Sequence, residues 1–191
     1  MERYLALAYW AGRKEDAHMC AVRASRFLSS LSELSADMTG WRETGRNKKE
    51  ALENKVYDPE NVSELERLFA LGFSKREVNH VFWNGGDETL NMRCGLESKI
   101  STLGNAIVLY VPHSYNVMLL GALRALVLAF VDAWEPDWMA ITSRTKMNEY
   151  GTQKPFLDRA LYIRSNSGRP PTLLAATEEE LGHGTLLFGA M

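Results

Sequence analysis

Apolar side chains recur along the chain with two different periods, which predict where helices and strands lie. After Asp16, apolar residues stand at three-and-four spacing through Leu34, with charged and polar residues between them, as in an amphipathic helix. Tyr4–Trp10 is almost wholly apolar and is followed by Gly12, which is typical of a strand buried on both faces. We therefore expect the chain to open with a buried strand and a helix.

The same criteria place the remaining elements. Asn61 stands three residues before Glu64, a capping arrangement that predicts the start of a helix ending at Gly72. Val117–Trp134 is apolar enough to form a helix buried on most sides, and Glu135-Pro136-Asp137 ends it. The other predicted elements are a short helix over Lys48–Asn54 and strands over His80–Asn84, Leu90–Leu96, Ala106–Val111, Trp138–Ser143 and Leu161–Ser165.

The order of these elements predicts the fold class. A strand, two helices, three strands, a helix and further strands do not alternate as in a parallel βαβ fold. Gly85-Gly86-Asp87 separates two of the three consecutive strands as a hairpin turn, which favours an antiparallel meander. We expect an α+β fold with helices packed on a predominantly antiparallel sheet. A length of 191 residues suits a single domain over residues 1–191.

Composition and charge restrict the class of binding partner and the cellular compartment. The chain is 46% hydrophobic and 24% charged, which indicates a globular protein. Its net charge of −2 argues against direct nucleic-acid binding and mildly favours a basic partner. The most apolar stretch, Val117–Val131, contains Arg124 and is shorter than the roughly 20 residues that span a bilayer, so no membrane is expected. The sequence contains only two cysteines and shows no signal peptide, and both features favour a cytoplasmic location.

Residues able to carry chemistry are sparse and dispersed. The four histidines, His18, His80, His113 and His183, lie far apart without metal-ligand spacing, and no nucleotide-binding or nucleophile motif occurs, so neither a metal nor a cofactor is expected. One enzymatic alternative stays open at this point. Cys94, His113 and an acidic residue would form the pocket of a small hydrolase or transferase if folding brought them together.

Tryptophans beside carboxylates are a more unusual feature. Trp83, Trp134 and Trp138 lie close to turn signals, in segments that also contain acidic residues. Aromatic anchors beside carboxylates suit the recognition of a basic protein surface, because the rings supply contact area and the charges supply steering. An equally good interpretation is that these rings fill the edges of the core.

Short motifs run in order across most of the chain, and they become sparse between Tyr150 and Met191 except for Gly184-Thr185-Leu186. The others are Tyr9-Trp10, Arg26-Phe27-Leu28, Gly40-Trp41, Lys49-Glu50-Ala51-Leu52, Leu71-Gly72-Phe73, Phe82-Trp83-Asn84-Gly85, Cys94-Gly95, Val111-Pro112 and Pro136-Asp137-Trp138. In this order and spacing they resemble the immunity protein 52 family of bacterial polymorphic toxin systems.

The resemblance implies a non-enzymatic antitoxin that binds and neutralises a cognate toxin. It further implies a nuclease toxin with a restriction-endonuclease-like domain, delivered between competing bacteria as in type VI secretion. The alternative from a third class is a structural subunit of a larger assembly. For the antitoxin, the predicted toxin contacts are the acidic and aromatic residues Asp87, Glu88, Trp134, Glu135, Asp137 and Glu178.

Overall fold

A computed structural model describes residues 2–13, 15–73, 77–86, 88–95, 105–151, 154–168 and 176–190, with the backbone alone for 72–73, 77–78 and 94–95. The described helices are α1 (Ala17–Leu34), α2 (Lys48–Glu53), α3 (Val62–Phe73), α4 (Leu120–Trp134) and α5 (Arg144–Tyr150), with one 3-10 turn, η1 (Ala36–Met38). The described strands are β1 (Tyr4–Trp10), β2 (Arg42–Glu43), β3 (Glu77–Trp83), β4 (Thr89–Gly95), β5 (Asn105–Tyr110), β6 (Trp138–Ser143), β7 (Ala160–Arg164), β8 (Thr177–Leu181) and β9 (Gly184–Phe188).

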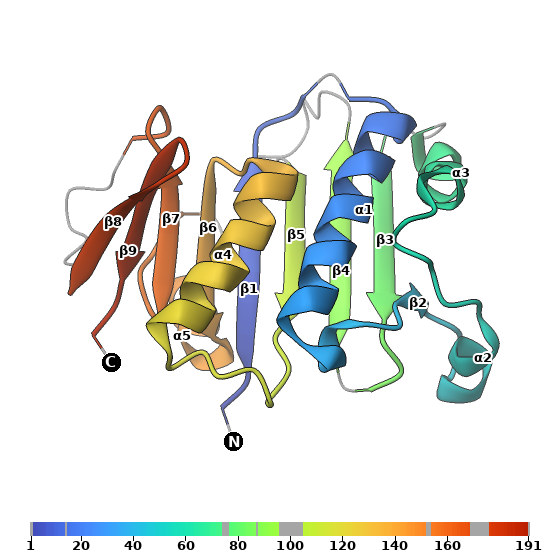
Figure 1. The fold of residues 1–191 in the computed structure, drawn as a ribbon, viewed down its shortest axis with the longest axis horizontal. Helices are drawn as coiled ribbons and strands as arrows, with labels where there is room; N and C mark the ends of the chain where they lie inside the picture. The colour runs from blue at the N-terminus through green and yellow to red at the C-terminus, as the bar shows by residue number, and fades with distance from the viewer. Residues whose placement is uncertain are drawn as a thin grey trace.

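All nine of these strands join one sheet in the order β2-β3-β4-β5-β1-β6-β7-β9-β8 (Figure 1). Every described pairing is antiparallel, which confirms the predicted sheet type and the meander β3-β4-β5. The first strand, β1, lies in the middle between β5 and β6, so residues Leu5 to Trp10 are buried from both sides as their apolar run predicts. The α+β fold is thus confirmed.

Helices cover the two faces of the sheet unequally. In Figure 1, α1 and α4 lie side by side across one face, and α3 packs beside α1. Phe27 of α1 meets Phe130 of α4 edge to face with ring centroids 4.6 Å apart, at full burial. Burying each ring contributes about 1.5–3 kcal/mol. The short helix α5 packs on the opposite face, where Met147 lies against Leu5, Leu7 and Tyr9.

Local capping explains where the helices begin. Asp16 precedes α1 and accepts a hydrogen bond from the Met19 amide at 2.8 Å, which satisfies one of the unpaired N–H groups of the first turn. The predicted Asn61 cap is also present, because its side chain accepts from the Glu64 amide at 3.2 Å. The start of α3 was therefore predictable from a short polar motif, and the Asp16 cap was not predicted.

Several elements differ from the prediction, among them α4, α5 and β8; the short strand β2 and the last strand β9 were not predicted either. The helix α4 begins at Leu120 rather than Val117, because the side chain of Asn116 accepts from the Met118 amide and holds residues 116–118 in a turn. The helix α5 was missed because its polar sequence has no apolar stripe; Ser143 caps it by accepting from the Lys146 amide at 3.1 Å. The strand β8 was missed because it is mostly glutamate. No helix in the described ranges is long and apolar enough to cross a bilayer.

Candidate protein-interaction surface

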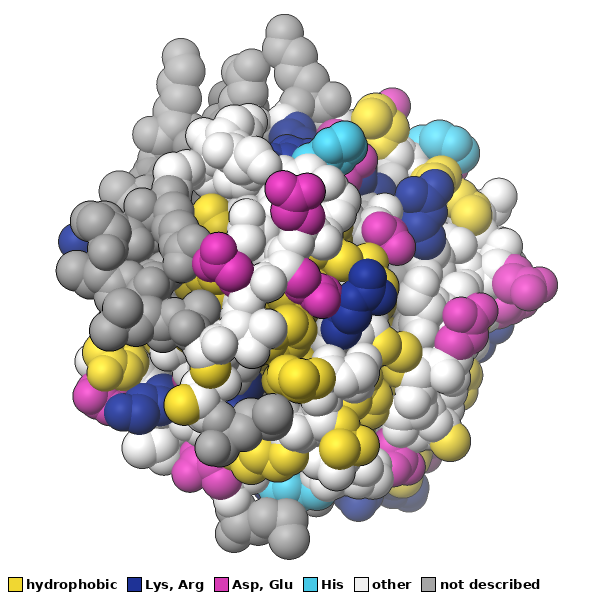
Figure 2. Space-filling view, turned by 60° about the vertical axis from the view of Figure 1, so that its left-hand side comes forward, with side chains coloured by type: hydrophobic (Ala, Val, Ile, Leu, Met, Phe, Trp, Pro, Cys, Tyr) yellow, Lys and Arg dark blue, Asp and Glu magenta, His cyan; other side chains and the backbone are white. Residues whose placement is uncertain are grey.

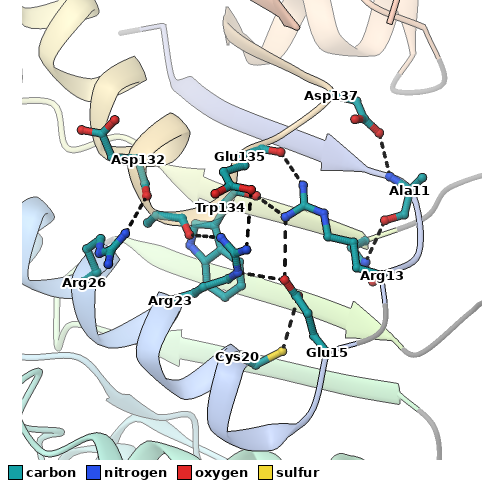
Figure 3. Close-up of polar contacts among 12 residues, drawn as sticks. Ala11, Arg13, Glu15, Cys20, Arg23, Arg26, Asp132, Trp134, Glu135 and Asp137 are labelled. Atoms are coloured by element: carbon teal, nitrogen blue, oxygen red, sulfur yellow. Dashed lines mark hydrogen bonds and ion pairs between the residues drawn. The ribbon is translucent and has the colours of Figure 1, made fainter. Parts of the chain in front are cut away.

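Arginines from α1 and the loop before it gather at the C-terminal end of α4 (Figure 3). Arg26 donates to the Asp132 carbonyl at 3.2 Å and Arg23 to the Ala133 carbonyl at 2.8 Å. Arg13 donates to the Trp134 carbonyl at 2.8 Å and also to the Glu135 carbonyl. The last carbonyls of a helix have no partner within the helix and carry its negative dipole end. The arginines therefore fix α1 against α4.

Carboxylates of the same region complete an ion-pair network. Glu15 is only 7% exposed and pairs with Arg23 at 2.8 Å and with Arg13 at 3.8 Å. Burial lowers the pKa of the Arg13 guanidinium, whereas the charge of Glu15 opposes that shift. Glu135 lies 3.6 Å from both Arg23 and Arg164. Glu135 is thus held by cations of its own chain.

The turn after α4 brings two of the predicted contact residues together. Glu135 adopts a left-handed backbone with φ of 45°, which ends the helix and directs the chain into β6. Asp137 accepts a hydrogen bond from the Ala11 amide at 2.8 Å and lies 4.0 Å from Arg164. Glu135 and Asp137 stay partly exposed, at 51% and 33% of their side chains. They form one small charged site at the end of α4.

Trp134 requires a correction. Its side chain is fully buried and packs against Trp10 at 5.4 Å and Phe27 at 6.4 Å between ring centroids. A ring enclosed in the core has no surface to offer a partner, so Trp134 supports the fold and does not supply contact area. Its neighbour Trp138 is the partly exposed ring of this turn, and it stacks on Tyr9 at 4.4 Å.

A groove opens beside Trp138 on the face of the sheet opposite α1 and α4. Its volume is about 460 Å³, and Trp138 and Ile163 supply its apolar floor while Asp137 and Asn166 supply polar groups. Such a mixture suits a side chain with an apolar stem and a basic head. Predicting it required knowing that Trp138 and Ile163 pair across β6 and β7.

The other predicted carboxylates lie elsewhere. Glu88 sits at the β3–β4 hairpin and accepts from the Asn84 side chain at 2.8 Å. Glu178 is exposed on β8, six strand positions from β4 in the sheet order, or roughly 29 Å at ~4.8 Å per strand. Asp87 falls outside the described residues. Among the predicted carboxylates that the structure describes, it brings together Glu135 and Asp137 only.

A second surface on the β8 side of the sheet was only partly anticipated. Figure 2 shows acidic side chains gathered near hydrophobic ones on this side of the molecule. Three consecutive glutamates occupy β8, and the middle one, Glu179, pairs with Arg124 of α4 at 2.8 Å. Just before Arg124, three large apolar side chains are exposed: Met118 by 44%, Leu119 by 58% and Leu120 by 41%. The apolar run Val117–Trp134 predicts, by contrast, that these three residues lie in a largely buried helix.

The enzymatic alternative loses its geometric support. Cys94 lies near the end of β4, whereas His113 follows β5 at the opposite end of the sheet, since Leu90 pairs with Leu109. Cys94 lies four strand residues, or roughly 13 Å, from the level of the Leu90–Leu109 pair, and His113 lies four residues beyond Leu109. Cys20 is the other cysteine and is a buried free thiol. Within the described ranges, no three His, Cys, Asp or Glu side chains gather as a metal site.

Comparison with known proteins assigns the chain to a family. A family model for Imm52, immunity protein 52, matches residues 2–188. No curated protein matches. Among solved structures the chain is similar to the Pseudomonas aeruginosa T6SS protein PA0821, with a TM-score of 0.57, 12% identity and coverage of 98% of this chain and 65% of that one. At this identity the likeness concerns the fold. Because the family model spans nearly the whole chain, the protein belongs to the immunity protein 52 family.

Proposed function

We propose that this protein is an antitoxin that neutralises a cognate antibacterial toxin by binding it in a stable, stoichiometric complex. The match of the immunity protein 52 family to residues 2–188 carries the proposal. The fold shared with a T6SS protein supports a role in competition between bacteria. The whole chain, residues 1–191, acts as the binding unit, and inhibition requires no chemical step in the antitoxin.

We further propose that the toxin is a nuclease with a restriction-endonuclease-like domain. A nuclease site attracts anions, so an inhibitor with exposed carboxylates is matched to it in charge. The net charge of −2 and the exposed glutamates of β8 support this pairing. A nuclease acts on nucleic acid inside the cell, which places the complex in the cytoplasm. The free thiol of Cys20 suits such a reducing compartment.

Glu88, Glu135, Asp137 and Glu178 are the proposed contact residues that the structure describes. Charge reversal at Glu135 or Asp137 would also break the pairs with Arg23 and Arg164, so it would test folding together with binding. Neutral substitution by Gln or Asn is the cleaner probe at these two positions. Neutral substitution suits Glu88 and Glu178 as well, because Glu88 accepts a hydrogen bond from the Asn84 side chain and Glu178 also interacts within the chain.

Co-expression tests the function directly. Bacteria that produce the toxin domain encoded by the adjacent reading frame are expected to grow only when this protein is present, and the two proteins are expected to co-purify at equal stoichiometry. The matched control is an unrelated antitoxin expressed at the same level. A toxin that kills equally well with and without this protein would refute the proposed function.

A further inference from the structure

The central strand β1 starts at the end of the sheet where α4 and α5 also begin (Figure 1). On one side of it, the Val111 amide donates to the Tyr4 carbonyl at 3.0 Å, and the chain then runs on into α4. On the other side, the Arg144 amide at the start of α5 donates to the Arg3 carbonyl at 2.8 Å. Three segments that are distant in the sequence therefore meet at the start of β1.

Two hollows open next to each other at this end of the molecule. The first has a volume of about 370 Å³ and is lined by Glu2, Tyr4 and residues 111–118. The second has a volume of about 490 Å³ and is lined by Glu2, Arg3, Arg144, Thr145 and Asn148. Because Glu2 lines both, the hollows belong to one surface. We call residues 2–4, 111–120 and 144–148 the β1-end surface.

Two arginines of this surface lie opposite each other. Tyr4 pairs with Ser143, and the same register places Arg3 opposite Arg144. Both side chains are exposed, and in the part of the chain that the structure describes neither has an ion pair. The carboxylate of Glu2 beside them accepts from the Thr145 amide and hydroxyl at 3.3 and 3.1 Å. Like charges directly opposite each other are unfavourable, so this arrangement favours an anion from outside the chain.

The start of α4 shows a second unfavourable feature. Leu119 is the N-cap residue of α4, where Ser, Thr, Asp or Asn would accept a hydrogen bond from the first turn, and its side chain makes no capping bond. Leu119 is 58% exposed, and its neighbours Met118 and Leu120 are 44% and 41% exposed. Exposed apolar side chains grouped in this way commonly mark a protein contact. Apolar surface thus takes the place of a helix cap.

We propose that the β1-end surface binds a loop of the cognate toxin that carries one acidic and one large apolar side chain. This inference rests on the proposed antitoxin function and names the surface and the partner chemistry. The toxin carboxylate accepts hydrogen bonds from the guanidinium groups of Arg3 and Arg144, and the apolar side chain packs on Met118 and Leu119.

Both features destabilise the free protein and become favourable only in the complex. Local rules of stability are broken at functional sites more than elsewhere, which is why the two exceptions on one surface carry the inference. A protein partner fits better than a nucleic acid, because the chain has a net charge of −2 and the arginines adjoin exposed apolar side chains instead of further cations.

Charge reversal tests the electrostatic half of the inference. The double variant Arg3→Glu, Arg144→Glu is expected to bind the purified toxin domain roughly 100-fold more weakly than the wild type. The matched control is Arg46→Glu, Lys49→Glu, which makes the same charge change at exposed sites in and just before α2. Its affinity should stay within about twofold of the wild type, because salt screens distant charges. Equal affinities for the two double variants would overturn the inference.

Neutral substitution separates binding from folding. Arg3→Gln, Arg144→Gln removes the repulsion between the two side chains, so the free variant should melt no lower than the wild type. The toxin should nevertheless dissociate about tenfold faster from it, since the charged hydrogen bonds are lost. A lower melting temperature with an unchanged dissociation rate would assign the arginines to the fold and contradict a binding role.

A serine at the helix cap tests the apolar half. Leu119→Ser supplies the missing cap and should raise the melting temperature of the free protein by about 2–4 °C. The same change removes apolar contact area, so the toxin should dissociate about tenfold faster. The control is Leu52→Ser on α2, which is 48% exposed in the wild type and should leave the dissociation rate unchanged. Equal dissociation rates for the two serine variants would exclude Leu119 from the contact.

The outcomes separate this inference from the function itself. If the wild-type protein protects cells and binds toxin, but the arginine and leucine variants behave like their controls, the antitoxin role stands and the docking surface is wrong. If the wild-type protein neither protects nor binds, the proposed function fails first. A short DNA duplex that binds the wild type but not Arg3→Glu, Arg144→Glu would assign the arginines to phosphates and refute the acidic protein partner.

Discussion

Glu15 shows at the residue scale how one buried charge organises a region. Its carboxylate is 7% exposed and lies between Arg23 and Arg13, which themselves bind the end of α4. A charge removed from water is tolerated only while its partners stay in place. The network therefore joins the loop after β1, α1 and α4, and its failure should loosen all three.

Replacing Arg23 tests this dependence. Arg23→Met removes the 2.8 Å pair with Glu15 and the hydrogen bond to Ala133, and it should lower the free energy of unfolding by about 3 kcal/mol. Urea denaturation measures the loss. Arg26→Met is the control, because Arg26 makes an exposed 3.2 Å bond to Asp132 and should cost under about 1 kcal/mol. Equal losses would mean that Glu15 is solvated.

His80 predicts weakening in acid. Burial lowers the pKa of His80 below its ordinary value of 6.5, so the folded state binds a proton less readily than the unfolded chain. Its stabilising contribution is complete above pH 6.5 and is lost as the pH falls toward the lower folded pKa. The unfolding free energy of His80→Gln should depend less on pH in this range. An unchanged pH dependence would contradict the assignment.

The environment of His18 predicts the opposite pH dependence of stability, with a contribution that is present in acid. A 2.8 Å hydrogen bond to Glu66, and then its charge, raise the pKa of His18 above 6.5. The folded state therefore holds the proton more tightly, and the pair links α1 to α3 most strongly below pH 6.5 and loses this contribution as the pH rises through the folded pKa. Titration of the ring signals by NMR should show the raised pKa in the wild type and its return toward 6.5 in Glu66→Gln.

At the element scale, close approach of strands decides which glycines are replaceable. A Cβ at Gly184 in β9 would lie 2.4 Å from the Ile163 carbonyl oxygen and 2.7 Å from the Tyr162 ring, whereas one at Gly121 in α4 would meet nothing within 4 Å. Gly184 is thus required by the packing of β7 against β9. Gly121 occupies an open position in the first turn of a helix.

Alanine at the two glycines should shift stability in opposite directions. Gly184→Ala should destabilise by about 1–3 kcal/mol through overpacking, and Gly121→Ala should stabilise by about 0.5 kcal/mol through helix propensity. Thermal unfolding followed by circular dichroism measures both. If Gly184→Ala melts at or above the wild-type temperature, then β7 and β9 are less closely packed than the structure shows.

Element types were largely predictable, and the misses share a physical cause. Apolar periodicity identified β1 and α1 because each buries side chains in the pattern of its own backbone. The strand β8 was not predicted because its sequence is mostly glutamate and lacks apolar alternation. The helix α5 was not predicted because it packs on the sheet through Met147 and has no apolar stripe. Elements at the border of a core carry little apolar signal.

At the scale of the whole molecule, a single continuous sheet predicts cooperative unfolding. The nine described strands join from β2 to β8 without a break, and β1 from the start of the chain lies at the centre. Tryptophan fluorescence, dominated by buried Trp10, Trp41 and Trp134, should change in the same urea range as far-UV circular dichroism. Separate transitions for the two signals would indicate independently folding parts and contradict the predicted single domain.

The sequence by itself determined the antiparallel α+β class, the position of most elements and the resemblance to the immunity protein 52 family, because these depend on local periodicity, capping and ordered motifs. Only the tertiary structure decided which candidate residues share a surface. It buried Trp134, joined Glu135 to Asp137, moved Glu88 and Glu178 apart, and placed Arg124 of α4 beside Glu179 of β8. Strand order and register cause this, since they bring together residues that are distant along the chain.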